Sequence, residues 1–334
     1  MKILCYGIQE SEKAIFLTEN KKYNNELIFT NELLNHENIK NLPANTDAVI
    51  LFVNCLADKK NLEYFKTKGV KYVVTRTVGL DHIDLKAATD LKYKIGRVPS
   101  YSPTAVASLA FSFGTELLRR TGWMTYQLKQ LNFKIDENMF AKEFKNSTIG
   151  IIGTGRIGYE TAKYWHGTGA KVLGYDPYEN EQAKQILEYT SVDKILKEAD
   201  LISLHIPYIK GENDNYVNDE FISKMNNFSS LVNVSRAALV DHDAIRRAIK
   251  SNKLYGYAAD VFIDESKFIN NKFSEMDAKK INANAVDLIN LYPRVLLSPH
   301  VGYFTDEAVK NMAEISFLNL SELEKTGTCQ TAAN

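Results

Sequence analysis

Three glycines with the spacing Gly-x-Gly-x-x-Gly form the most informative group in the chain. Gly153, Gly155 and Gly158 follow the apolar run 148–152 and open a stretch with helical character. The first glycine permits a tight turn, the second lets the backbone approach a pyrophosphate, and the third lets the helix pack closely on the strand. Free N–H groups and the positive end of the helix dipole then attract phosphate oxygens. The pattern predicts a dinucleotide-binding loop.

An acidic residue stands where the ribose of such a nucleotide would be recognised. Asp176 ends the next apolar run and lies 18 residues after Gly158, near the usual spacing of about twenty. Its carboxylate can accept hydrogen bonds from ribose hydroxyls and would repel a 2′-phosphate, so we expect NAD rather than NADP. Flavoproteins and methyltransferases use similar turns, and a plain tight turn in an α/β protein is the other alternative.

The later β-rich runs end in side chains that can do chemistry. Ligands of open α/β sheets bind outside the carboxyl ends of the strands. The residues that follow the remaining predicted strands are His205 after 201–204, Arg236 after 231–234, Glu265 after 257–261 and His300 after 295–298. One edge of the sheet is therefore expected to collect a guanidinium, a carboxylate and an imidazole beside the glycine loop.

Arg236, Glu265 and His300 together favour the reduction of a 2-oxo acid. Arg236 can bind a carboxylate bidentately and fix the acid in one orientation. His300 can donate a proton to the carbonyl oxygen as a hydride reaches the carbon, and a nearby Glu265 would raise the pKa of the imidazole.

Each of these residues also has a less specific interpretation. Arg236 alone can be a surface or capping arginine, Glu265 a solvated loop acid, and His300 a buried core histidine. The other histidines are interpreted as structural or surface residues, and backbone and apolar contacts are expected at His205. These other histidines are His36, His82, His166 and His242.

The elements that must position these residues form two series. With 334 residues, the chain exceeds the roughly 250–300 residues at which one core stops growing, so two domains are expected. Alternation of strands and helices predicts an α/β fold with parallel sheets. The predicted strands are Lys2–Tyr6, Ala48–Phe52, Lys71–Thr75 and Lys94–Gly96 in the first series, and Thr148–Ile152, Lys171–Tyr175, Leu201–Leu204, Leu231–Val234, Tyr257–Val261 and Val295–Ser298 in the second.

Two long helices complete the pattern. Ser102-Pro103 is a good start for a helix that runs to about Arg120. A last helix begins at Thr305 and ends near Gly327, and its expected buried stripe consists of Ala308, Met312, Ile315 and Leu318. The polar stretch 264–284 is interpreted as a surface loop with a helix in it.

Composition excludes several classes of partner. Hydrophobic residues make up 45% of the chain, charged residues 25%, and the formal net charge is zero. We therefore expect no nucleic-acid or membrane partner. The first residues are interpreted as a strand rather than a signal peptide. Cys5, Cys55 and Cys329 lack metal-ligand spacing, so we expect no metal site, and they suit a reducing cytoplasm.

Several ordered motifs resemble those of the D-isomer-specific 2-hydroxyacid dehydrogenases, and the resemblance runs nearly end to end. Besides the glycine loop, the segments that carry it are 69–79, 98–103, 231–236, 259–261 and 298–303. The resemblance implies a Rossmann NAD domain over residues 102–299. It also implies a smaller, discontinuous, flavodoxin-like substrate domain made of 1–101 and 300–334. It further implies a cleft that closes by hinge motion and a homodimer built mainly on the cofactor domains.

The resemblance also assigns roles to residues. Arg236, Glu265 and His300 would be the substrate-carboxylate binder, the partner of the histidine, and the acid/base. Substrate would further meet the N–H groups of Val78 and Gly79 and the side chains of Tyr101, Phe52 and Tyr303. Asp260 would meet the nicotinamide carboxamide. The cofactor site would comprise Gly153, Gly155, Arg156, Ile157, Gly158, Asp176, Ile206, Pro207, Asn213, Val234, Ser235 and Asp260.

Within the family, the long interval from Glu265 to His300 resembles the D-lactate and D-2-hydroxyisocaproate branch. Relatives that reduce 2-oxoglutarate carry an arginine near the position of Phe52, so the phenyl group argues for a substrate with an apolar side chain. Departures from the family pattern are Ala237, where glycine is frequent, and Thr104 and Ser108, where asparagine and glutamate are frequent.

These features lead to one main interpretation and three alternatives. The main one is a D-lactate-type dehydrogenase that reduces pyruvate with NADH. The nearest alternative is the same chemistry on a bulkier acid, such as 2-oxoisocaproate or phenylpyruvate. The others are an NAD-sensing binding protein and a methyltransferase-like use of the glycine loop. The physiological direction, any allostery and any assembly beyond a dimer are left open by the sequence.

Overall fold

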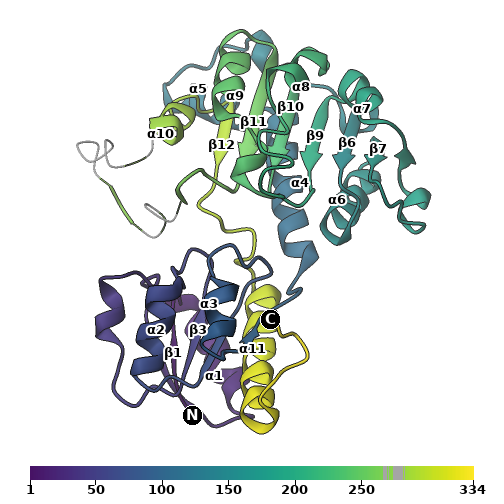
Figure 1. Cartoon of the computed structure of the whole chain (residues 1–334). Helices are drawn as coiled ribbons and strands as arrows, with labels where there is room; N and C mark the ends of the chain where they lie inside the picture. The colour runs from purple at the N-terminus through teal and green to yellow at the C-terminus, as the bar shows by residue number, and fades with distance from the viewer. Residues whose placement is uncertain (266–268, 270, 274–280, 282) are drawn as a thin grey trace. The chain divides into compact units, whose positions relative to one another are not determined.

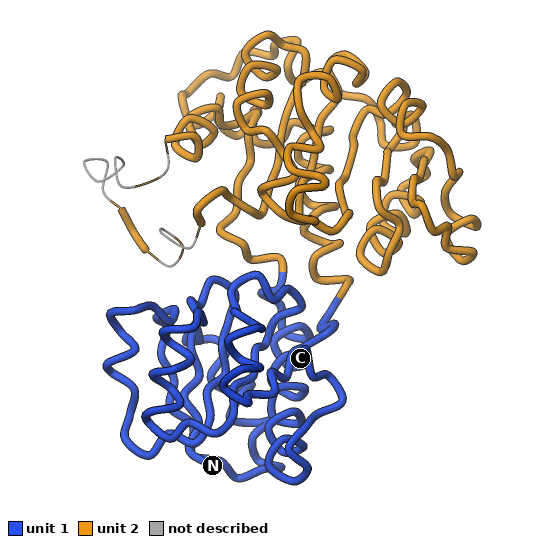
Figure 2. Tube along the Cα trace, viewed as in Figure 1, with its two compact units in different colours: residues 1–102, 303–334 blue, residues 103–302 orange. Residues whose placement is uncertain are grey.

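A computed structural model describes residues 1–265, 269, 271–273, 281 and 283–334. The chain divides into two compact units, coloured separately in Figure 2. Unit 1 contains residues 1–102 and 303–334, and unit 2 contains residues 103–302. The predicted loop with a helix over 264–284 lies largely outside the described residues.

Unit 1 is built on a parallel five-stranded sheet with the order β2-β1-β3-β4-β5. That order is the flavodoxin-like form of the doubly wound fold, as predicted. Its strands are β1 (Lys2–Cys5), β2 (Glu26–Phe29), β3 (Ala48–Leu51), β4 (Tyr72–Thr75) and β5 (Ile95–Gly96). Sequence patterning missed β2, because this strand begins with an exposed glutamate and its other three residues are only partly buried.

The helices of unit 1 pack on one another as well as on the sheet. They are α1 (Glu10–Asn20), η1 (Asn38–Asn41), α2 (Lys59–Thr67), α3 (Leu85–Asp90) and α11 (Asp306–Thr326). The C-terminal α11, yellow in Figure 1, lies beside α1. The rings of Phe16 and Phe317 meet edge to face there, with centroids 5.9 Å apart. This contact joins the two sequence segments of the unit in one core.

The boundaries predicted for α11 are confirmed, but its predicted buried stripe is partly wrong. Thr305 is the N-cap and Gly327 adopts a left-handed conformation at the C-cap. Ala308 and Met312 are buried, whereas Ile315 is only partly buried and Leu318 is 44% exposed. Phe317 and Leu320 occupy the core instead. The stripe is displaced because the helix also buries polar residues such as Asn319, whose side chain donates to the carbonyl of Arg97.

Unit 2 contains a parallel seven-stranded sheet with the order β12-β11-β10-β9-β6-β7-β8. Its strands are β6 (Thr148–Ile152), β7 (Lys171–Tyr175), β8 (Glu188–Tyr189), β9 (Leu201–Leu204), β10 (Ser229–Asn233), β11 (Leu254–Ala259) and β12 (Val295–Leu297). This is the Rossmann order with one extra strand, and the order reverses at β6. The two-residue β8 is too short to leave a sequence pattern, so six strands were expected.

The helices of unit 2 form two packed groups around that sheet. They are α4 (Pro103–Arg119), α5 (Thr121–Lys129), α6 (Arg156–Gly167), α7 (Val192–Glu198), α8 (Asp219–Lys224), α9 (His242–Lys250) and α10 (Ala283–Ile289), with short 3-10 turns η2 (Glu137–Met139), η3 (Phe144–Asn146), η4 (Ala183–Gln185) and η5 (Ala237–Leu239). Helix α4 packs against α6, while α8 and α10 both pack against α9. Trp165 of α6 is fully buried in the α4–α6 contact.

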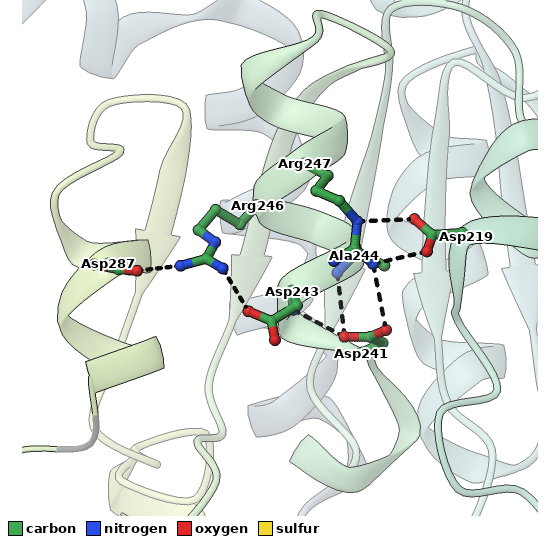
Figure 3. A network of polar contacts seen from close by, with 7 residues as sticks. All are labelled: Asp219, Asp241, Asp243, Ala244, Arg246, Arg247 and Asp287. Atoms are coloured by element: carbon green, nitrogen blue, oxygen red, sulfur yellow. Dashed lines mark hydrogen bonds and ion pairs between the residues drawn. The ribbon is translucent and has the colours of Figure 1, made fainter.

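Two arginines of α9 tie this helix to both of its neighbours (Figure 3). Arg247 pairs with Asp219 of α8 at 2.7 Å, and Arg246 pairs with Asp287 of α10. Asp241 caps α9 by accepting from the backbone N–H groups of Asp243 and Ala244. Because α10 directly precedes β12, these pairs help to fix the strand that leads to His300.

Candidate functional site

The glycine loop is shaped by contacts that leave no room for side chains at two of its positions. Gly153 follows β6 with a φ of +94°, and a Cβ there would lie 2.7 Å from the carbonyl carbon of His205. A Cβ on Gly158 would lie 1.9 Å from the carbonyl oxygen of Gly153. Gly155 differs, since it is the N-cap of α6 and a Cβ added to it would meet nothing within 4 Å. The loop therefore presents the backbone of Gly155 openly, which suits a pyrophosphate.

Asp176 lies against this loop, at the end of β7. One oxygen of its carboxylate accepts the backbone N–H of Thr154 at 2.7 Å, and the other accepts that of Tyr178 at 2.9 Å. The hydroxyl of Tyr189 contacts the Thr154 hydroxyl at 2.7 Å and accepts the backbone N–H of Asn180. Sequence analysis missed the roles of Thr154 and Tyr189, since Thr154 occupies a variable position of the glycine pattern and β8, which carries Tyr189, was not expected.

The loop after β9 borders the glycine loop. A Cβ added to Gly153 would lie within 3 Å of backbone atoms of both His205 and Ile206. The Asn213 side chain donates to the carbonyl of Pro207 at 2.9 Å and accepts the N–H of Ile209 at 2.8 Å. The Asn213 amide therefore stabilises the conformation of this loop through hydrogen bonds to its backbone. Its predicted contact with the cofactor stays a prediction, as do those of Arg156 and Ile157 at the start of α6.

A second turn, after β10, carries Arg236. The fully buried Asn233 accepts the N–H of Ser235 and donates to the carbonyl of Arg236 at 2.9 Å. The Ser235 hydroxyl donates to the carbonyl of Leu204, and Val234 packs against the core beneath α4. Asn233 was missed because a buried asparagine at a strand end has no distinctive sequence signal.

His300 and Glu265 meet in the structure. The Nδ1 atom of His300 lies 2.6 Å from a carboxylate oxygen of Glu265, and the other oxygen of Glu265 accepts the N–H of Phe262. The imidazole therefore donates through Nδ1, which leaves Nε2 as the ring nitrogen that can exchange a proton with another group. Both side chains are largely shielded from solvent.

The charges around His300 control its protonation. Burial lowers the pKa of the imidazole, but the hydrogen bond and charge of Glu265, together with the charge of Asp260, outweigh it and raise the pKa above its ordinary value. The positive charge of Arg236 acts in the opposite direction, which shows that this guanidinium lies within electrostatic range. The arrangement favours an imidazolium, which is the form that can donate a proton.

Asp260 fixes the turn that carries His300. Its carboxylate accepts from the Ser298 hydroxyl, from the N–H of Val301 at 2.8 Å and from the N–H of Gly302 at 2.7 Å. His300 itself has a φ of +55°, in the left-handed region that residues other than glycine rarely adopt. Asp260 therefore holds His300 in an unfavourable backbone conformation, whereas its predicted contact with a nicotinamide stays a prediction.

The residues of unit 1 that the resemblance assigns to substrate lie at the carboxyl ends of its strands and near α11. The rings of Phe52 and Tyr303 meet with centroids 4.7 Å apart. The Thr77 hydroxyl donates to the carbonyl of Gly79 at 2.7 Å and orders the segment that contains the partly exposed Val78. The backbone carbonyl of Tyr101 accepts from Asn311 of α11.

The backbone contact expected at His205 is present beside Gly153, and in addition the Nε2 atom of His205 is hydrogen-bonded to the Ser203 hydroxyl at 2.9 Å. Burial lowers the pKa of His205 to about 3, so the ring is neutral at physiological pH.

All three cysteines are free and buried, and burial raises the pKa of Cys55 to about 11. Over residues 1–265 and 283–334 and the few described between them, no group of histidine, cysteine and acidic side chains is arranged to hold a metal ion. Among the same residues, no helix has the length and apolar character needed to cross a membrane.

Comparisons with known proteins agree with this geometry. Residues 111–302 match the family model described as "D-isomer specific 2-hydroxyacid dehydrogenase, NAD binding domain". An aromatic 2-oxoacid reductase of Clostridium sporogenes is 34% identical over 99% of this chain and 98% of its own length. A D-lactate dehydrogenase of Lactobacillus delbrueckii is also 34% identical, over 99% of this chain and 98% of its own length.

A solved structure extends the similarity to three dimensions. The D-lactate dehydrogenase of Lactobacillus jensenii, solved with NAD⁺, superposes with a TM-score of 0.84 at 31% identity and covers 100% of both chains. The open backbone at Gly155 and the acid at Asp176 fit the same cofactor. Since the sequence, the sheet order and the cofactor loop all agree, this chain belongs to the D-isomer specific 2-hydroxyacid dehydrogenase family and is an oxidoreductase that uses NAD.

Proposed function

We propose that this enzyme reduces pyruvate to D-lactate, with His300 as the proton donor. The observation that carries the proposal is the His300–Glu265 pair at 2.6 Å, within electrostatic range of Arg236. The overall reaction is R–CO–COO⁻ + NADH + H⁺ to R–CHOH–COO⁻ + NAD⁺. NADH supplies the hydride that reaches the carbonyl carbon.

The side chains then have separate tasks. Arg236 binds the substrate carboxylate bidentately, which orients the carbonyl group. The N–H groups of Val78 and Gly79 hold the same carboxylate. His300 donates its Nε2 proton to the carbonyl oxygen as that oxygen gains negative charge, and Glu265 stabilises the imidazolium before the transfer. A positioned acid of this kind accelerates a reaction by roughly 10²–10⁴.

The test is NADH oxidation, followed by absorbance, with pyruvate, 2-oxobutyrate, 2-oxoisocaproate, phenylpyruvate and 2-oxoglutarate in parallel. We expect the highest kcat/KM with pyruvate and a product of D configuration. His300→Ala should abolish nearly all turnover and leave the NADH Kd largely unchanged. Full turnover in His300→Ala would refute the acid assignment. If the wild-type protein oxidised no NADH with any of the five acids but still bound NADH, the result would favour an NAD-sensing binding protein.

A bulkier 2-oxo acid is the second candidate substrate. Two observations favour it, namely the aromatic contact between Phe52 and Tyr303 and the similarity to the aromatic 2-oxoacid reductase of Clostridium sporogenes. The chemistry at His300 is the same in both cases. A higher kcat/KM with phenylpyruvate than with pyruvate would establish this candidate. It would change the substrate that we assign and leave the proposed mechanism as it is.

We also propose that the enzyme is a cytoplasmic homodimer that associates through unit 2. The segment after α5 exposes Leu131, Phe133, Ile135 and Phe140, each between 77% and 87%. The segment is nevertheless held in place, because Arg120 donates to the carbonyl of Phe140 at 2.7 Å. An ordered, exposed apolar strip is typical of an interface.

Light scattering tests the dimer. The wild-type protein should have twice the chain mass, and the double variant Phe133→Ser with Phe140→Ser should have the monomer mass. A monomeric wild type would refute the dimer.

A further inference from the structure

A fully buried ion pair lies beneath the aromatic residues of unit 1. Arg76 is 0% exposed and follows β4, while Glu12 of α1 is 1% exposed. One terminal nitrogen of Arg76 donates to a Glu12 oxygen at 2.6 Å, and the other donates to the carbonyl of Gly7 at 2.7 Å. Glu12 is itself held, since it accepts the backbone N–H of Gln9 at 2.8 Å. The guanidinium therefore has a fixed position and plane.

The face of this guanidinium supports Phe52. The central carbon of the Arg76 guanidinium lies 3.8 Å from the centroid of the Phe52 ring and 5.8 Å from that of Tyr303. A cation in contact with an aromatic face is attracted by the ring, most strongly where water is excluded. On another side, a Cβ built on Gly7 would lie 3.1 Å from Phe52, so the backbone also confines the ring. Phe52 is thus held by Arg76, by Gly7 and by the Tyr303 ring.

Stability alone does not account for this arrangement. Two buried charges lose their hydration, and apolar residues of similar volume often stabilise a protein as well or better. What Arg76 supplies and an apolar residue lacks is a planar cation with fixed donors, which orients a neighbouring ring. The specific contribution of Arg76 is therefore to fix the rotamer of Phe52.

We propose that Arg76 is a positioning residue that sets the selectivity for the substrate side chain. It holds the Phe52 ring in a single orientation against Tyr303, so that these two rings form a wall of fixed shape. The proposal rests on the proposed function, because it takes Phe52 and Tyr303 to face the substrate side chain. Arg76 itself touches neither the substrate nor NADH.

The test uses the double variant Arg76→Met with Glu12→Gln, which removes both charges and leaves an amide oxygen to accept from Gln9. We expect kcat/KM for the acid that the wild type prefers, pyruvate or phenylpyruvate, to fall about tenfold relative to the other acid. The change should appear mainly in KM, with the NADH Kd unaltered. Arg76→Lys keeps the charge but loses the planar face, so it should shift the ratio of kcat/KM for the two acids in the same direction. It provides the test if the double variant fails to fold.

Arg120→Met provides a matched control. The Arg120 guanidinium lies 4.1 Å from the ring centroid of Tyr255 in unit 2, so the same kind of contact is lost away from Phe52. Because Arg120 also holds the segment of the proposed interface, light scattering first checks that the variant keeps the wild-type mass. At that mass, the variant should lose thermal stability without a change in the ratio of kcat/KM for the two acids.

A double-mutant cycle with Phe52→Leu separates positioning from a general structural effect. If Arg76 acts through Phe52, the Arg76 variants should no longer change the ratio once the ring is gone. An unchanged ratio in both Arg76 variants, or an equal change in the Phe52→Leu background, would overturn the inference and leave the proposed function intact. Absence of turnover by the wild-type enzyme with both acids would overturn both.

Discussion

Replacing Gly155 by alanine should separate folding from cofactor binding in a single substitution. Gly155 has a φ of −61° and a ψ of −166°, an extended conformation that alanine can adopt. An added Cβ would meet no atom within 4 Å. Without cofactor, the substitution should therefore leave stability unchanged or raise it by roughly 0.4–1 kcal/mol, because alanine restricts the unfolded chain.

NADH affinity should move in the opposite direction. We expect the backbone to approach the pyrophosphate at the open space beside Gly155, where a methyl group would push the pyrophosphate away. Loss of one hydrogen bond to a charged phosphate corresponds to about 1.5–3 kcal/mol, which is about a ten- to hundredfold rise in Kd. Fluorescence titration with NADH and thermal unfolding of the apoenzyme measure the two effects separately.

Gly167→Ala is the matched control. Gly167 is the last residue of the same helix, and an added Cβ there also meets nothing within 4 Å. Its stability should change like that of Gly155→Ala, but its NADH Kd should equal that of the wild type. If Gly155→Ala bound NADH as tightly as Gly167→Ala, the assignment of Gly155 to the pyrophosphate would be refuted.

Three further predictions concern the charged residues. Glu265→Gln should lower the pKa of His300, so the loss of 2-oxo acid reduction as pH rises should begin at lower pH; a pH profile of kcat/KM identical to that of the wild type would contradict the role of Glu265. Arg236→Lys should raise the KM for the 2-oxo acid at least tenfold through loss of bidentate geometry, and steady-state kinetics with unaltered KM and kcat would exclude that role. Asp176→Ala should relax discrimination against NADPH and also weaken NADH binding, because the N–H of Thr154 loses its acceptor; strict NADH preference in the variant would show that Asp176 is not the selector.

Much of unit 2 could be predicted because its functional residues stand at the ends of buried strands. The runs before the glycine loop and before Asp176 coincide with β6 and β7. Convergence of Glu265 and His300 followed from the rule that parallel strands present their carboxyl ends at one edge. The contact itself, 2.6 Å, depends on two loops of irregular backbone, including Asp264 and His300 in left-handed conformations.

What could not be predicted is the set of residues that hold the functional ones in place. Asp260 was expected at the site, but its hydrogen bonds to the turn of His300 were not, and Asn233 was not expected at all; such bonds to backbone groups have no characteristic spacing. The pairing of Arg76 with Glu12 joins residues 64 positions apart in the chain. Short or partly exposed strands such as β2 and β8 escaped detection because their burial pattern is weak.

The attachment of the His300 turn to Asp260 has a consequence for how such enzymes can diversify. Because Asp260 fastens residues 298–302 to the end of β11, the proposed proton donor His300 belongs to the same unit as the glycine loop. The aromatic pair of Phe52 and Tyr303 belongs to the other unit, which begins again at Tyr303. If the proposed function holds, substitutions in that unit would alter which substrate side chain is accepted and would leave the surroundings of His300 and of the glycine loop unchanged. The proposed determinants of selectivity and of reactivity would then lie in separately variable units of one chain.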